Sequence, residues 1–120
     1  HPDLVATEDF DLWLRMSHRE PIAYLPQPMT FYRVHSGSLS ANGRFLRGTD
    51  HIMERVAREH PGEAHFENLI RRRRAAVRLD VAWDLLAAGE RQKARAMIAE
   101  ADRLVRTWKG FKMRLRSWLP

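Results

Sequence analysis

Apolar residues recur every three or four positions over most of the chain, and this spacing is typical of amphipathic helices. Five stretches show it, near residues 8–20, 43–60, 63–88, 90–105 and 108–119. The pattern predicts a mainly α fold, a bundle of four to five helices arranged partly as hairpins. In the longest stretch the apolar positions are Phe66, Leu69, Ile70, Val77, Val81, Leu85 and Leu86.

Residues that start or stop helices lie between these stretches. Thr7 is a candidate N-cap for the first helix. Pro21 ends that helix, because proline disfavours a helical conformation in the residue before it. Gly89 fits the position just beyond a helix C-terminus, so residues 63–105 are expected to form an antiparallel hairpin.

The segment 22–34 has a different pattern and predicts a small two-stranded β element. Residues 22–25 are apolar and lie between Pro21 and Pro26, whereas residues 29–34 are rich in β-branched and aromatic side chains. Two short strands do not make a stable sheet alone. We therefore expect a larger sheet beside them in a longer protein. Without that sheet the segment would be irregular, would rearrange, or would pair between chains in a homodimer.

Composition narrows the class of protein. The 120 residues suffice for one domain or for the tail of a larger one, and a start at His1 without Met suggests an excised fragment. The absence of cysteine excludes disulfides, thiolate nucleophiles and cysteine zinc sites. The 6 histidines lack metal-site spacing and no phosphate-binding glycine motif occurs, so this chain alone is expected to form neither site.

Charge is positive overall and unevenly distributed. The formal net charge is +6; residues 3–11 carry acids without Lys or Arg, and residues 109–116 carry bases without acids. The basic end suggests an anionic partner, either nucleic acid or a membrane surface. Solvated helix faces are the plainer interpretation, and we favour it.

Four consecutive arginines occupy residues 71–74. Because consecutive residues of a helix lie about 100° apart, these side chains wrap around the helix and do not form one flat patch. We expect them to be solvated or to pack along their stems. A basic nucleic-acid-binding domain, which would use residues 71–74 and the basic end, is a further alternative function. We do not favour it and expect no nucleic-acid partner, since the aromatic residues are spaced for helix packing and not for base stacking.

The segment 108–120 combines large apolar residues with bases. That combination suits a helix that lies in a membrane interface, as a peripheral contact. A last helix that caps the bundle, with its bases solvated, is the alternative that we favour. The residues concerned are Phe111, Leu115, Trp118 and Leu119, among Lys109, Lys112, Arg114 and Arg116.

Small and apolar residues of the predicted hairpin resemble one tetratricopeptide repeat. A repeat array needs about three such units, and one is present here. The hairpin supports an alternative function for the chain, a non-enzymatic helical module that binds a protein partner. The matching positions are Ala82, Leu85, Gly89, Ala94, Ile98 and Ala101.

Glu8 and Asp9 are the candidates for acid–base chemistry. A carboxylate in the first turn of a helix is kept ionised by the dipole and by nearby N–H groups, which suits a general base. Glu8 could orient Asp9 or bind a substrate hydroxyl. The alternative is that these acids only oppose the helix dipole, as does Asp11, which can also pair with Arg15 four residues later. Composition alone favours this alternative.

Three motifs, taken in order, resemble the C-terminal end of the catalytic domain of family 2 glycosyltransferases. They are residues 8–15 (EDFDLWLR), 22–26 (IAYLP) and 31–40 (FYRVHSGSLS). Members of this family are inverting enzymes of the GT-A fold that use nucleotide-sugar donors, usually with a divalent metal. The resemblance implies that residues 1–40 end such a domain and that residues 41–120 form a helical appendage.

The resemblance also implies roles for single residues. Asp9 corresponds to the catalytic base, with Glu8 beside it, and Tyr32, Arg33 and His35 correspond to the side of the cleft that holds the donor phosphates and the metal. His35 would be the metal ligand of this chain. In the full-length enzyme these residues would stabilise the departing phosphates.

The family's nucleotide-binding half, with its Asp-x-Asp metal motif, has no counterpart in this chain. We therefore expect Mg or Mn as cofactor in the full-length enzyme and none in this chain alone, which should be inactive. The expected partners are a nucleotide-sugar donor and an acceptor hydroxyl. The expected location is cytoplasmic, with residues 108–120 as the peripheral membrane contact.

Overall fold

The computed structural model describes residues 4, 6–31 and 45–118. This part of the chain contains five helices, which confirms the prediction of a mainly helical protein. The helices are α1 (Glu8–Ser17), α2 (Phe45–Glu59), α3 (Ala64–Ala87), α4 (Arg91–Leu104) and α5 (Trp108–Trp118).

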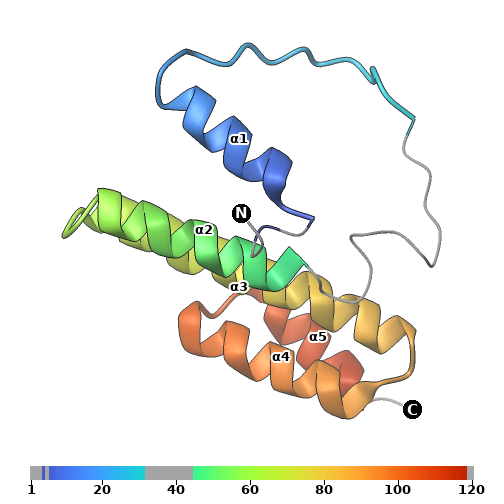
Figure 1. The fold of residues 1–120 in the computed structure, drawn as a ribbon. Helices are drawn as coiled ribbons and strands as arrows, with labels where there is room; N and C mark the ends of the chain where they lie inside the picture. The colour runs from blue at the N-terminus through green and yellow to red at the C-terminus, as the bar shows by residue number, and fades with distance from the viewer. Residues whose placement is uncertain (1–3, 5, 32–44, 119–120) are drawn as a thin grey trace.

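The longest helix, α3, lies at the centre of the arrangement. It packs most extensively against α4, next against α2, and least against α5. Figure 1 shows α1 on the far side of α2, so that α1 and the α4–α5 pair lie on opposite sides of the α2–α3 layer. The central position of α3 explains why its buried residues are distributed around its axis and not along one face.

The buried apolar side chains form two separate clusters. One joins α3, α4 and α5, and its most buried members include Leu79, Ala82 and Ile98. The other joins the N-terminal residues to α2 and α3 around Ile52, which is fully buried. Ala residues dominate the α3–α4 contact, and such small side chains allow two helices to approach closely. The second cluster consists of Leu4, Ile52, Met53 and Ile70, with Phe10, Leu14, Val56 and Phe66 packed against it.

Two of the predicted helix ends are confirmed, one with a different hydrogen bond. Gly89 follows α3 with φ of +79°, the left-handed conformation that glycine adopts most readily. Thr7 occupies the N-cap position of α1 but makes no side-chain cap. Its hydroxyl instead donates to the carbonyl of Leu4 at 3.1 Å, and its backbone carbonyl accepts from the N–H of Asp11.

The closest approach between α2 and the N-terminal residues is at Gly48. A Cβ on Gly48 would overlap the hydroxyl of Thr7, and both residues are buried. Glycine within a helix costs roughly 0.5–1 kcal/mol relative to alanine. At this position the missing side chain is what allows Thr7 to lie against α2.

The prediction of a strand pair is wrong for residues 22–31, which form no strand in the structure. The segment is extended and exposed, and it runs away from the helices in Figure 1. Its side-chain pattern suits a strand, but a strand also needs a neighbouring backbone for its N–H and C=O groups. Among the described residues none supplies that neighbour, and Pro26 and Pro28 have no N–H to donate. Residues 32–34 of the predicted pair lie outside the described residues.

Arg78 of α3 connects three helices. Its guanidinium donates two hydrogen bonds to Asp50 of α2, with Nη2–Oδ2 at 2.8 Å and Nη1–Oδ1 at 3.2 Å, and one from Nε to Glu100 of α4 at 3.1 Å. The bond to Asp50 is the largest influence on the pKa of Arg78. Together with Glu100 it outweighs partial burial and raises that pKa above its ordinary value. Arg78 therefore stays charged between the layers of the bundle.

Candidate functional site

Glu8 and Asp9 lie in the first turn of α1, and both side chains are exposed. Oδ1 of Asp9 accepts a hydrogen bond from the backbone N–H of Phe10 at 2.7 Å. The positive end of the helix dipole favours a carboxylate at this position. An exposed carboxylate of this kind can accept a proton from a bound molecule, provided that the molecule reaches α1.

The third acid of this turn, Asp11, has a different environment. It is 6% exposed and lies between two guanidinium groups, with 2.8 Å to Nη2 of Arg15 and 2.8 Å to Nη2 of Arg55. Partial burial alone would raise the pKa of Asp11. The hydrogen bonds and charges of Arg55 and Arg15 outweigh that effect and hold the pKa below its ordinary value.

The two faces of α1 also differ in burial. On the inner face, Phe10 and Leu14 pack against the cluster around Ile52, and the guanidinium of Arg73 lies 4.8 Å from the centre of the Phe10 ring. The outer face leaves three large apolar side chains about half exposed. Asp11 and Phe10 therefore hold α1 on the bundle, whereas Asp9 and Glu8 remain accessible. The exposed apolar residues are Leu12 (53%), Trp13 (53%) and Met16 (46%).

The other predicted site residues, Tyr32, Arg33 and His35, lie outside the described residues. Their position relative to Asp9 therefore stays a prediction, as does the assignment of His35 as a metal ligand. Within residues 4, 6–31 and 45–118, no group of three His, Asp or Glu side chains could hold a metal ion. The described residues thus bring Glu8 and Asp9 together and offer no metal site beside them.

Three of the four arginines of residues 71–74 are exposed, and Arg74 is partly buried. Arg72 bonds to Asn68, Arg73 stacks on Phe10, and Arg74 donates to the carbonyl of Asp50 at 3.2 Å and to Glu54 at 3.3 Å. The guanidinium groups make these contacts, so packing along the side-chain stems stays a prediction, whereas the exposure of residues 71–73 agrees with the expected solvation.

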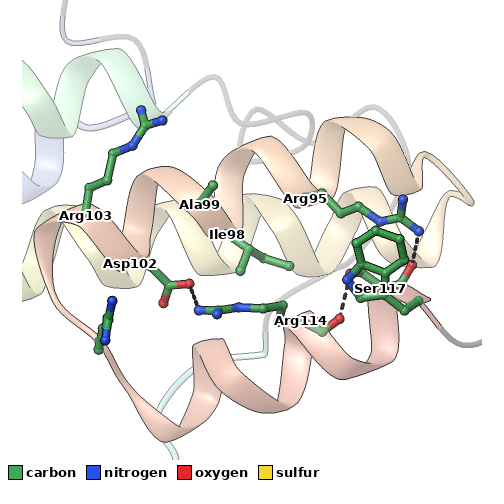
Figure 2. Close-up of a pocket in the computed structure, with 9 residues that line it drawn as sticks. Arg95, Ile98, Ala99, Asp102, Arg103, Arg114 and Ser117 are labelled. Carbon is green, nitrogen blue, oxygen red and sulfur yellow. Dashed lines mark hydrogen bonds and ion pairs between the residues drawn. The ribbon is translucent and has the colours of Figure 1, made fainter.

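A cavity between α4 and α5 was not expected from the sequence. It has a volume of about 440 Å³, and four of its nine lining residues are arginines. Figure 2 shows Arg95 beside Ser117, and Arg114 beside Asp102, across a floor of Ile98 and Ala99. Arg114 forms an ion pair with Asp102, which is the one acid that lines the cavity. The other lining arginines are Arg95, Arg103 and Arg106.

Arg95 has an unusual environment in this cavity. It donates from Nη2 to the carbonyl of Ser117 at 2.7 Å, and its guanidinium lies 3.8 Å from the centre of a Trp118 ring. Its Nε is buried and has no hydrogen-bond partner among the described residues. One sequence signal was available, because Arg95, Asp102 and Arg103 are seven and eight positions apart and thus share one face of a helix. Their meeting with Arg114 of α5 depends on the tertiary fold.

A second cavity, of about 550 Å³, lies beside the turn between α3 and α4. It is lined by both helices of the hairpin, close to Gly89. The lining combines apolar residues with three charged ones: Val81, Asp84, Leu85, Ala88, Glu90, Lys93, Ala96 and Met97.

Comparison with known proteins assigns no family to the chain. No family model matches it, and neither a curated protein nor a solved structure gave a match. In the described residues no helix has both the length and the hydrophobicity to cross a membrane.

Proposed function

We propose that this chain is the C-terminal part of an inverting family 2 glycosyltransferase in which Asp9 is the catalytic base. The observation that carries the proposal is a difference in environment among the three acids of α1. Asp11 is buried and holds the helix on α2 through Arg55, while Glu8 and Asp9 are exposed at the same helix start. If all three acids only opposed the helix dipole, this difference in burial and pairing would not be needed.

In the proposed reaction Asp9 removes the proton from an acceptor hydroxyl. The acceptor oxygen then forms a bond to the anomeric carbon of the donor, the bond from that carbon to the phosphate oxygen breaks, and the electron pair leaves with the nucleoside diphosphate. Attack opposite the leaving group inverts the configuration. Arg33 and His35 would hydrogen-bond the departing phosphates.

The described residues form no metal site, so we derive no step through the divalent ion. In this proposal Mg or Mn is held mainly by an upstream part of the enzyme, and the chain alone transfers no sugar. His35 is the candidate ligand from residues 1–40.

The exposed apolar side chains of the N-terminal third also support the proposal. Tyr24 is 86% exposed, Met29 72% and Phe31 105%, in an extended segment without packing partners among the described residues. Large apolar side chains in such numbers usually mark a surface that another part of a protein covers. In the proposed enzyme, the sheet of the catalytic domain would cover residues 22–31 and the outer face of α1.

The test compares Asp9→Asn with Asp11→Asn in the polypeptide that extends upstream of His1, as the proposal requires. Asp9→Asn should lower the rate of sugar transfer by about a hundredfold to ten-thousandfold and leave donor affinity and thermal stability unchanged. Asp11→Asn should lower stability instead. If Asp9→Asn lowers stability and not the rate, its acid serves only the helix start. Saturable UDP-sugar binding by the 120-residue chain in calorimetry would contradict its expected inactivity.

A second candidate function, a helical module that binds a protein partner, is favoured by the cavity beside Gly89. This cavity presents apolar groups such as Leu85 and Met97 next to Glu90 and Lys93. Cross-linking of a partner from the native source should then depend on the hairpin. Substitution of Met97 by Glu should abolish it, whereas Glu at exposed Leu69 on the other half of α3 should not. Equal effects of both substitutions would contradict this function.

A further inference from the structure

The helix α5 packs against the bundle through one narrow face, where Met113 enters the core between two small residues. Gly110, Met113 and Ser117 are its buried residues. A Cβ on Gly110 would lie 3.2 Å from Oδ1 of Asp102 and 3.3 Å from Oγ1 of Thr107, so α5 lies close to its neighbours at this position. Met113 is the one large apolar residue of α5 that is buried in the core, and the others are about half exposed or more.

These outward residues form one continuous stripe. Their positions differ by three, four and three residues, which places them on one face of the helix. Each is between 45% and 69% exposed, although all are apolar or aromatic. A terminal helix that only caps a bundle would place such residues inward. The stripe consists of Trp108 (69%), Phe111 (45%), Leu115 (54%) and Trp118 (69%).

Cationic side chains border this stripe on the side that faces α3. Nζ of Lys112 lies 5.9 Å from the centre of a Trp108 ring, and the guanidinium of Arg116 lies 4.7 Å from a ring of Trp83. Neither cation forms a hydrogen bond or ion pair with a carboxylate among the described residues. Trp83 is itself 48% exposed and extends the aromatic surface beyond α5.

The arginine-lined cavity borders the stripe on its other side. Arg103 and Arg106 are exposed there, and no acid of the described residues pairs with them. Arg95 stacks on Trp118 with its Nε unpartnered, as described above. The helix α5 carries no acid. An apolar ridge with two Trp residues therefore lies between two cationic borders.

We propose that α5 is an interfacial helix that binds the surface of an anionic lipid bilayer. Its stripe would enter the headgroup region, where Trp residues are favoured, and Lys112, Arg116 and the arginines of the cavity would contact lipid phosphates. The 11 residues of α5 measure about 16 Å, about half the hydrocarbon thickness, so the helix lies along the surface. This inference does not depend on the proposed transferase activity.

Charge complementarity favours a lipid surface over a second copy of the chain. Two copies that met through this face would bring their cationic borders together without an acid on α5 to pair with them. An anionic bilayer supplies phosphates around the whole stripe and an apolar medium beneath it. Both parts of the surface are then satisfied by one partner.

The test is sedimentation of the 120-residue chain with vesicles of phosphatidylcholine, with and without phosphatidylglycerol. We expect binding to the anionic vesicles only, with a blue shift of tryptophan emission. Lys112→Glu with Arg116→Glu should lower the partition coefficient by about thirtyfold or more. Phe111→Ser with Trp118→Ser should lower it by about tenfold or more.

Two matched controls have the same chemistry elsewhere on the protein. Arg58→Glu with Arg71→Glu makes an equal charge change at exposed positions of α2 and α3, and Trp13→Ser removes a tryptophan of α1 that is 53% exposed. Both should bind vesicles as the parent chain does, with unchanged circular dichroism.

Four results would overturn the proposal. The first is absence of binding to anionic vesicles, and the second is an equal loss in the control variants. The third is a dimer in analytical ultracentrifugation that Phe111→Ser with Trp118→Ser dissociates, because a second copy would then occupy the stripe. The fourth result concerns inorganic phosphate, which distinguishes a lipid headgroup from a free anion. If phosphate abolishes the binding and the binding gives no blue shift of tryptophan emission, the site takes a free anion, and this would contradict a lipid site.

Discussion

Asp11 of α1 and Arg55 of α2 form an ion pair, with Oδ1 and Nη2 2.8 Å apart, between residues 44 positions apart in the chain. Arg55 also donates to both carboxylate oxygens of Glu59 at 2.9 Å, which fixes its guanidinium. The Asp11 side chain is 8% exposed and that of Arg55 is 21% exposed. The pair is thus the main polar connection between the helix that carries Asp9 and the rest of the bundle.

We expect Asp11→Asn to lower the free energy of unfolding by about 1–3 kcal/mol, because it leaves Arg55 partly buried without its charged partner. Urea denaturation followed by circular dichroism measures this. Asp9→Asn is the matched control on the same helix turn and should change stability by less than about 0.5 kcal/mol. Equal effects of the two substitutions would show that Asp11 does not hold α1 in place.

The lowered pKa of Asp11 also predicts how its contribution depends on pH. Folding is favoured by the ionised form, so the contribution is fully present above the ordinary carboxyl pKa of about 3.9. It is lost as pH falls through the lowered pKa of the folded state. The difference in unfolding free energy between the parent chain and Asp11→Asn should therefore be constant near neutral pH and shrink below about pH 4. A difference that grows on acidification would contradict this assignment.

Gly48→Ala should destabilise the protein by about 1–3 kcal/mol, although alanine is the better helix former. The added Cβ would overlap the Thr7 hydroxyl and push the N-terminal residues away from α2. Thr7→Ala removes the overlapping group, so the double variant should be more stable than the sum of the two single effects. Thermal unfolding of the four proteins measures the coupling. Strict additivity would show that the two residues do not meet.

Arg78→Ala should lower the free energy of unfolding by about 1–3 kcal/mol, because it removes three hydrogen bonds that join α2, α3 and α4. Two of these bonds are made to the partly buried carboxylate of Asp50. Lys93→Ala is the control. Lys93 pairs with Glu90 within one turn at the surface, where an ion pair contributes about 0–1 kcal/mol. A similar cost for both variants in urea denaturation would show that the position of Arg78 between the helices is unimportant.

The helices could be predicted because their signals are local. The spacing of apolar residues predicts α3, and Gly89 predicts where it ends. In the structure Gly89 has the left-handed conformation that such a helix end requires. The pairing of Asp11 with Arg15 was also local, since one helical turn separates them, and the structure confirms it. Arg55 could not be predicted as a second partner, because no pattern within the sequence indicates which residue 44 positions away will be near.

The prediction for residues 22–31 failed for a related reason. Alternation of side chains describes what a strand presents to its surroundings, but a strand exists only with a hydrogen-bonded neighbour. The arginine-lined cavity between α4 and α5 could not be predicted, because Arg95 and Arg114 lie on different helices. For the candidate site, the structure shows that Glu8 and Asp9 are exposed. Their roles stay predictions, as do those of Tyr32, Arg33 and His35.

Among the described helices, α3 is the one that contributes to both hydrophobic clusters. We therefore expect the two clusters to unfold locally with different free energies. Ile52 and its neighbours can lose α1 without disturbing Leu79, Ala82 and Ile98 at the α3–α4 contact. Amide hydrogens in the middle of α3 and α4 should therefore exchange with deuterium only through global unfolding, and those of α1 through local detachment. Because Asp9 is carried by α1, the candidate base belongs to the part of the protein that a partner can reposition without unfolding the bundle.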